Sequence, residues 1–238
     1  MVTFSSPLLE GTLIQRYKRF FADVRLAGTG GVVTAHVANT GSMKTCGAPG
    51  DTVYLLPTPD PKRKLAYNWE LTRIGDGLVG VNTARPNHVV AAAVRAGRIE
   101  ELKDATFVRQ EAKYGANSRI DLLLEERRGN KQVNVYVEVK NATLLAADGS
   151  VAFPDAVTSR GLKHLEELST MVAAGHRAVM LFFVNRTDGL HVRAAHEIDP
   201  AYAAGLKRAH AAGVEILAYR AEHTLEALAL GARVPVVV

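Results

Sequence analysis

The sequence predicts two structural units, a small all-β barrel followed by an α/β domain. Residues 8–82 hold short runs rich in Val, Tyr and Thr, separated by turn signals such as GTGG at 28–31. Closing these strands into a barrel would leave no open edge. Residues 85–102 are instead Ala-rich with apolar residues at helical spacing, and strands and helices alternate after them. We therefore expect domains at 1–83 and 84–238.

The second unit begins with three consecutive strands, which predicts an antiparallel opening before strands and helices alternate. The expected strands cover 106–113, 118–125, 133–140, 178–185, 190–196 and 214–219, and the expected helices cover 159–174 and 200–212.

Composition excludes several classes of protein. The chain has 238 residues, of which 47% are hydrophobic, as in ordinary globular proteins. It contains no long apolar run and no secretory signal pattern, which predicts a cytoplasmic protein without membrane contact. Cys46 is the only cysteine, so an internal disulfide and a cysteine-based zinc site are excluded. The net charge of +5 favours polyanionic partners.

Two of the expected strands carry charges on one face. Along VNVYVEVK (133–140) the four valines share one face, whereas Glu138 and Lys140 lie on the other, because side chains alternate along a strand. In SRIDLLLE (118–125) the same alternation groups three apolar residues on the face opposite Asp121. The pair of strands therefore has an apolar face and a charged face.

The turn between these strands predicts which charges meet. If Gly129 and Asn130 form a two-residue turn, the register sets Asp121 directly across from Glu138. Like charges at that spacing are destabilising unless a cation compensates them. Two carboxylates suit Mg²⁺ or Mn²⁺, which prefer oxygen ligands. On the same face, Lys140 could orient a water or stabilise negative charge on a phosphorane.

A simpler interpretation of the hairpin is a solvated polar face in which Glu138 and Lys140 pair with each other or with water, and a longer turn would break the register. The order of residues favours the metal site. Asp121, a turn and then Glu138-Val139-Lys140 resemble the core of PD-(D/E)XK nucleases. Glu111, just upstream, is either a further acidic member of that site or a surface residue.

Longer motifs extend the resemblance to both halves of the chain. The sequence resembles the sugar fermentation stimulation protein (SfsA) family in NTGSM (39–43), PGDTVYL (49–55), PKRKLAYNWEL (61–71), VGVNT (79–83), YGANSRIDLLL (114–124), VEVKNATLL (137–145), FPDAVTSRGLKHLEEL (153–168), RAVMLFFVNR (177–186) and GVEILAY (213–219). The resemblance implies an OB-fold barrel followed by a PD-(D/E)XK nuclease-like α/β domain, and DNA binding linked to sugar use, especially maltose. By position, Asp121, Glu138 and Lys140 match the nuclease-like residues of the family.

Cations near the start of the helix at 159–174 are candidates for nucleic-acid contact. Arg160, Lys163 and His164 lie at the helix end where the dipole favours anions, and a bound phosphate would relieve that conflict. The alternative is a solvated face on which Arg160 and Lys163 pair with nearby glutamates.

Two basic segments of the barrel are interleaved with aromatic residues, as in OB-folds that bind nucleic acid. The candidate residues are Arg16, Lys18 and Arg19 in RYKRFF, and Lys62, Arg63 and Lys64 in PKRKLAYNW.

These features predict a DNA-binding protein that contacts mainly the backbone, with weak sequence preference and strong salt dependence. One alternative is an active Mg²⁺- or Mn²⁺-dependent nuclease. A third is a module that binds small molecules or proteins, in which the acidic pair is structural.

Overall fold

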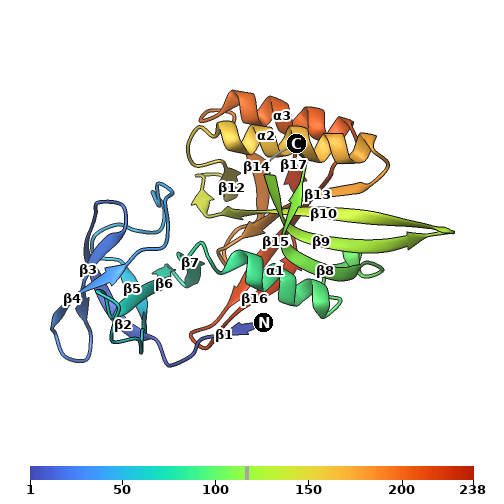
Figure 1. Cartoon of the computed structure of the whole chain (residues 1–238). Coiled ribbons are helices and arrows are strands. Elements are labelled where there is room, and N and C mark those ends of the chain that lie inside the picture. The colour runs from blue at the N-terminus through green and yellow to red at the C-terminus, as the bar shows by residue number, and fades with distance from the viewer. Residues whose placement is uncertain (116–117) are drawn as a thin grey trace.

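The computed structural model describes residues 1–115 and 118–238, so Ala116 and Asn117 of the YGANS motif lie outside the described residues. The N-terminal unit is a closed barrel, drawn in blue and cyan in Figure 1. Its strands run in the order β4-β3-β2-β5-β6-β7, and β4 also pairs with β6 to close the ring. Their bounds are β2 Leu9–Tyr17, β3 Phe21–Leu26, β4 Val32–His36, β5 Thr52–Pro57, β6 Tyr67–Ile74 and β7 Gly77–Gly80.

The barrel interior is apolar and includes the single cysteine. Trp69 and Leu55 are fully buried there, and Cys46 is packed among them. Burial raises the pKa of the Cys46 thiol to about 11, which keeps it protonated and inert at neutral pH. The barrel predicted from the sequence is confirmed.

The C-terminal unit is an α/β domain built on a seven-stranded sheet of order β1-β16-β15-β13-β10-β9-β8, with a second sheet of order β11-β12-β14-β17 beside it. Its helices are α1 Pro86–Arg95, α2 Ser159–Ala173 and α3 Pro200–Ala211, with a 3₁₀ turn at Glu100–Leu102. Its strands are β1 Val2–Thr3, β8 Thr106–Tyr114, β9 Ser118–Arg128, β10 Lys131–Ala142, β11 Leu144–Leu145, β12 Ser150–Phe153, β13 Arg177–Val184, β14 His191–Ala194, β15 Glu215–His223, β16 Ala227–Arg233 and β17 Val236–Val237.

Local signals explain where the helices begin and end. The side chain of Thr158 accepts a hydrogen bond from the amide of Gly161 at the start of α2, and Asp199 accepts one from Tyr202 at the start of α3. The Ala-rich helix ends at Arg95, earlier than expected, because Gly97 adopts a left-handed conformation that stops it.

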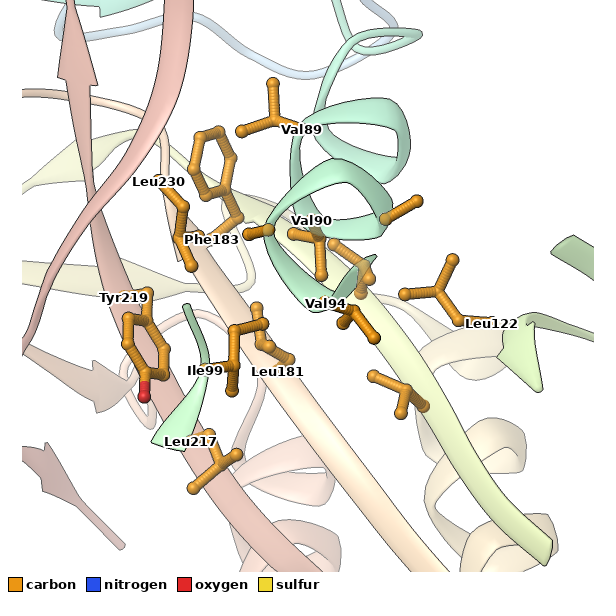
Figure 2. Close-up of a cluster of buried hydrophobic side chains, with 14 of the residues drawn as sticks. Val89, Val90, Val94, Ile99, Leu122, Leu181, Phe183, Leu217, Tyr219 and Leu230 are labelled. Atoms are coloured by element: carbon orange, nitrogen blue, oxygen red, sulfur yellow. The ribbon is translucent and has the colours of Figure 1, made fainter. Parts of the chain in front are cut away.

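Helices cover both faces of the large sheet (Figure 1). On one face α1 packs Val90 and Val94 against Leu181 of β13, as Figure 2 shows. On the other face α2 contributes Leu165 and Leu168. Because the central parallel strand β13 is buried on both sides, its sequence is continuously apolar rather than alternating.

The barrel and the α/β domain are joined by direct contacts. The amide of Gly80 in β7 donates a hydrogen bond of 2.8 Å to the backbone carbonyl of Asn185. The side-chain amide of Asn185 donates one of 3.1 Å to the carbonyl of Gly80. A Cβ at Gly80 would lie 2.1 Å from Asn185 Oδ1, so only glycine permits this approach. At the N-terminus, Val2 pairs with Leu228 in the large sheet, so the first residues of the chain lie with the α/β domain rather than the barrel. Within the described ranges, no helix has the length and apolar character needed to cross a membrane.

Candidate metal and nucleic-acid site

The β9–β10 hairpin has the predicted register. Arg128 pairs with Lys131 around the two-residue turn, and the ladder continues to the pair Leu122–Val137. The ladder stops there, one pair before Asp121 and Glu138. Beyond that point β9 stays paired with β8, whereas β10 stays paired with β13, so the two strands separate. The predicted register is therefore confirmed, but Asp121 and Glu138 flank the point of separation instead of forming a ladder pair.

The separation changes what Asp121 does. Its Oδ2 accepts a hydrogen bond of 2.7 Å from the backbone amide of Val139, replacing the missing strand carbonyl, and its Oδ1 accepts one of 2.8 Å from the side chain of Asn87 in α1. Burial, and then the nearby charge of Glu138, raise the pKa of Asp121 to about 6. The carboxylate is thus fixed in place but is easily protonated.

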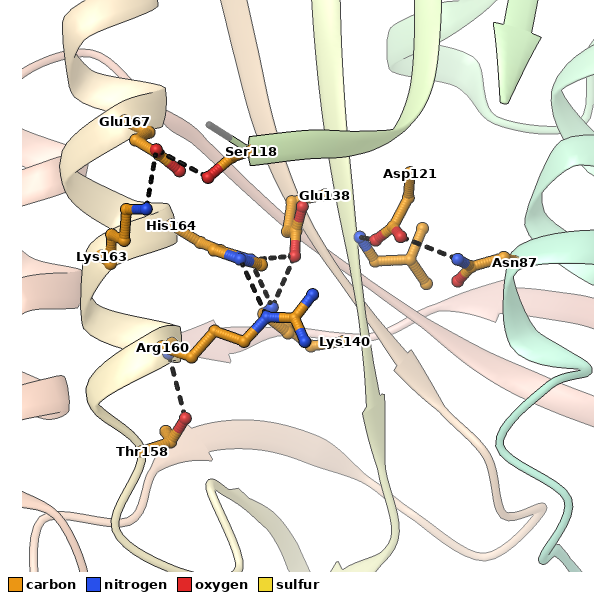
Figure 3. A network of polar contacts seen from close by, with 12 residues as sticks. Asn87, Ser118, Asp121, Glu138, Lys140, Thr158, Arg160, Lys163, His164 and Glu167 are labelled. Atoms are coloured by element: carbon orange, nitrogen blue, oxygen red, sulfur yellow. Dashed lines mark hydrogen bonds and ion pairs between the residues drawn. The ribbon is translucent and has the colours of Figure 1, made fainter. Parts of the chain in front are cut away.

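Glu138 lies at the centre of a buried polar cluster beneath α2 (Figure 3). Its Oε1 contacts Lys140 Nζ at 2.6 Å and the Nδ1 atom of His164, and Lys140 Nζ is 3.1 Å from the same imidazole nitrogen. Burial opposes ionisation of Glu138, but the hydrogen bonds and charges of His164 and Lys140 outweigh it and lower the pKa of this carboxyl. Glu138 is therefore an anion held between two nitrogen groups.

The second oxygen of Glu138 is not satisfied. Oε2 is buried without a hydrogen-bond partner among the described residues, as are the hydroxyls of Tyr114 and Tyr202. Burial, and next the charge of Glu138, raise the pKa of both phenols. Leaving a buried carboxylate oxygen unpaired is costly. A cation or water at this oxygen would remove the cost, so the donor set of Asp121 and Glu138 fits a divalent metal ion.

A groove of about 430 Å³ opens over this cluster. Asp121 and Glu138 line it together with the cations Arg119, Arg160 and Lys163. In the described part of the chain, no group of three or more His, Cys, Asp and Glu side chains is close enough to form a complete metal cage. A metal ion here would be held by the two carboxylates and would keep several waters, as Mg²⁺ does at phosphate-processing sites.

Glu111 lies on the rim of the same groove. It is exposed and adopts φ of 52°, a left-handed conformation that is strained for a residue with a side chain. Strain of this kind gathers at functional sites, where surrounding structure maintains it.

The candidate cations of α2 differ in their surroundings. His164 is buried against Glu138 rather than displayed to solvent, and Arg160 reaches its other ring nitrogen at 3.4 Å. Lys163 is exposed and lies 3.6 Å from Glu167, which is the pairing that the alternative interpretation expected. All three residues line the groove, but Arg160 and Lys163 are exposed, whereas His164 is buried and holds Glu138 in place.

The basic residues of the barrel divide in the same way. Arg16 points inward, donating hydrogen bonds to the carbonyls of Asn39 at 2.8 Å and Gly41 at 3.1 Å. The remaining barrel candidates are exposed in two loops, one at Lys18 and Arg19 and the other at Lys62, Arg63 and Lys64.

Three side chains of the site could not be assigned to it from the sequence. Asn87 follows a proline in the first turn of α1, a position that gives no sign of contact with a distant aspartate. Tyr114 comes near Glu138 through the pairing of β8 with β9 in the sheet, and Tyr202 through the packing of α3 beside the sheet.

The two units and the site between β9, β10 and α2 define a class: an OB-fold barrel joined to an α/β domain with a buried acidic and lysine-containing centre. The model of the SfsA N-terminal OB domain matches residues 14–81, and that of the sugar fermentation stimulation protein RE domain matches 84–227. The chain belongs to the sugar fermentation stimulation protein (SfsA) family.

Individual relatives agree with this assignment. A sugar fermentation stimulation protein homolog of Rhodospirillum rubrum is 53% identical over 90% of this chain and 89% of its own length. The homolog of Geobacter sulfurreducens is 50% identical over 97% of this chain and 96% of its own. The solved structure of Pyrococcus furiosus SfsA in complex with Ca²⁺ has a TM-score of 0.86 at 25% identity and covers both chains completely.

Proposed function

We propose that the protein binds DNA through backbone contacts and carries a centre that cleaves phosphodiester bonds with the help of Mg²⁺ or Mn²⁺. The observation that carries this proposal is the buried Oε2 of Glu138, which has no hydrogen-bond partner among residues 1–115 and 118–238 and belongs to a residue that lines a groove with several cations. The Pyrococcus relative was solved in complex with Ca²⁺, which supports a site for cations that prefer oxygen ligands.

Each residue has a role that follows from its position. Asp121 and Glu138 would hold the metal, which when bound supplies charge neutralisation at the phosphate and a more acidic water. Lys140, fixed by Glu138 at 2.6 Å, places a positive charge where negative charge develops on the phosphorus oxygens. His164 holds Glu138 in position, and Asn87 does the same for Asp121. Arg160 and Lys163 would bind the flanking phosphates.

Cleavage is tested on plasmid and single-stranded DNA with Mn²⁺, Mg²⁺ or EDTA. We expect metal-dependent nicking by the wild type, reduced at least about 100-fold by Asp121→Asn and by Lys140→Gln, because each removes a group that acts on the reacting phosphate. Asp104→Asn is the matched control, since it removes an equally charged but exposed side chain of the same domain.

The outcome also separates the two parts of the proposal. Binding without cleavage under every metal condition would leave a DNA-binding protein and eliminate the enzyme. Cleavage that survives both substitutions would show that these residues are not the centre.

Backbone binding is tested by salt dependence. Arg160→Gln and Lys163→Gln should each weaken DNA binding, because each removes one phosphate contact. Each should also make the negative slope of log K against log salt shallower by about 1. Lys103→Gln is the control, since Lys103 is also an exposed lysine paired with a glutamate one helical turn away. An unchanged slope in both groove variants would contradict the assignment.

A role in regulating sugar use, especially maltose, completes the proposal and follows from family membership alone. It predicts that deletion of the gene changes expression of sugar-utilisation genes, and that the wild-type gene restores it. Unchanged transcript levels would remove this part of the proposal while leaving the DNA-binding part intact.

A further inference from the structure

The junction between the barrel and the α/β domain contains a polar pocket that the proposed centre does not use. Its volume is about 200 Å³, and both units line it. The barrel contributes Thr40 and Gly41 of the NTGSM motif, and the α/β domain contributes chiefly Asn141, Phe153 and Asp155.

The barrel wall of this pocket is preformed. Arg16 donates hydrogen bonds to the backbone carbonyls of Asn39 and Gly41 and so fixes the loop that contains the NTGSM motif. The side chain of Asn39 accepts a hydrogen bond from the amide of Gly41 at 2.8 Å. Asp155 Oδ2 in turn accepts hydrogen bonds from the amide and hydroxyl of Ser42, at 2.7 Å and 3.0 Å. A Cβ at Gly41 would lie 2.7 Å from that same oxygen. The close approach of loop and carboxylate therefore requires glycine.

The pocket presents acceptors and an aromatic ring. Asn141 lines the pocket, and its Oδ1, which other atoms cover in this structure, has no hydrogen-bond partner in the described ranges. Asp155 adds a carboxylate, and Phe153, braced by Phe182 and Tyr202, adds an apolar surface. None of the residues lining the pocket is Lys or Arg. The chemistry thus disfavours a phosphate and suits a small, flat group that carries an amino group.

The residues of the pocket are close in the sequence to those of the proposed centre. Asn141 directly follows Lys140 on β10, and Phe153 and Asp155 lead into α2, where Arg160 lines the groove. Phe153 also packs against Tyr202, whose hydroxyl senses the charge of Glu138, so a nucleic-acid strand whose phosphates follow the groove would place a base near the end of β10. We propose that this pocket receives one unstacked, amino-bearing nucleobase, cytosine, adenine or guanine, from nucleic acid bound in the groove. This inference rests on the proposed function.

The test compares fluorescently labelled oligonucleotides about 12 nucleotides long, within the site size of an OB-fold. They are oligo(dT), oligo(dT) with one central dC, and oligo(dT) with one central abasic residue, all measured in EDTA. Thymine lacks an amino group, so we expect the single dC to tighten binding at least about fivefold, and the abasic residue to give no gain.

Two variants locate the preference. Asp155→Asn keeps an oxygen for Ser42 but removes the charge, and Asn141→Leu removes the unpaired acceptor. Both should lose the preference for dC while retaining the affinity for oligo(dT), and Asp104→Asn should retain both.

The possible failures are distinguishable. If the wild type binds none of the oligonucleotides, the proposed function fails together with this inference. Equal binding of all three, or a preference that survives both pocket variants, overturns the pocket inference alone. The melting temperature is also measured with free glucose or maltose. If these sugars raise it for the wild type but not for Asp155→Asn, and no base preference is seen, the pocket is a polyol site and the nucleobase inference is overturned.

Discussion

Two buried polar clusters of this protein contain a cation beside a carboxylate, yet they differ in how completely their atoms are paired. Arg186, with no exposed side-chain surface, donates to both oxygens of Asp188 at 2.6 Å and 2.8 Å. Its remaining nitrogen donates to the carbonyl of Thr143 at 2.8 Å and contacts the hydroxyl of Thr45 at 3.3 Å. Every nitrogen of the guanidinium is therefore used.

The cluster around Glu138 lacks this completeness. One carboxylate oxygen and two tyrosine hydroxyls beside it have no partner in the part of the chain that the structure describes, and the cluster opens into a groove. A buried charge whose hydrogen-bonding atoms are all paired stabilises the fold, whereas a buried charge with an unpaired atom in a residue that lines a groove can gain stability from a ligand.

The largest effect is expected from breaking the complete cluster. Arg186→Met should lower the free energy of unfolding by about 3 kcal/mol, because it removes the cation from both oxygens of Asp188 and one of the two hydrogen bonds to the carbonyl of Thr143. Urea denaturation measures this change. Arg233→Met, which removes an exposed arginine from its pair with Glu101, is the control and should cost less than about 1 kcal/mol. Equal losses in both variants would remove the distinction between the clusters.

An effect of opposite sign is expected in the open cluster. The pKa of Asp121 is about 6 in the folded protein, above its ordinary value, so the folded state retains a proton that the unfolded chain has lost and stability falls as the pH rises toward 6. Asp121→Asn removes this cost of about 3 kcal/mol, but its single amide oxygen replaces only one of the two acceptors of Asp121, so the free energy of unfolding should rise by about 2 kcal/mol at pH 8 in EDTA.

The same variant supplies its own control. Near pH 3 the carboxyl of Asp121 is protonated in the folded protein and largely so in the unfolded chain, so the gain should shrink toward zero. Excess Mn²⁺ at pH 8 should favour the wild type instead, because the metal needs the ionised carboxylate. A gain that is independent of pH would contradict the linkage to Asp121.

The smallest effect is expected at the rim. Glu111→Gly should raise the free energy of unfolding by about 1 kcal/mol, because glycine adopts the left-handed conformation of this position without strain. Lys113→Gly, at an exposed position of the same strand, should instead lower it by about 1 kcal/mol. Thermal unfolding of the two variants distinguishes them, and a loss of stability in both would show that Glu111 is not strained.

Much of the molecule could be predicted because the signals are local. Alternation of Val with polar residues along β10, the Gly-Asn turn and the cap residues of α2 and α3 each depend on near neighbours in the chain. The strand β16 was missed, since its sequence ALALGAR alternates weakly and its partners β1 and β15 are supplied by the fold. The length of the Ala-rich helix was overestimated, because the stop at Gly97 interrupts an otherwise helical pattern.

By itself, the sequence determined the barrel, the α/β domain, the hairpin register and the presence of Glu138 and Lys140 on one face of β10, since period and turn chemistry depend on consecutive residues. The predicted common face of Ile120, Leu122 and Leu124 was wrong, because Ile120 packs on the α2 side and the two leucines on the α1 side. Only the tertiary structure decided that β9 leaves β10 at Asp121, that His164 is buried and that Glu138 keeps an oxygen without a partner among the described residues. The physical reason is that these features depend on the contacts of β9 and β10 with β8, β13, α1 and α2, which lie elsewhere in the sequence. Such long-range contacts cannot be predicted from any single stretch of the sequence.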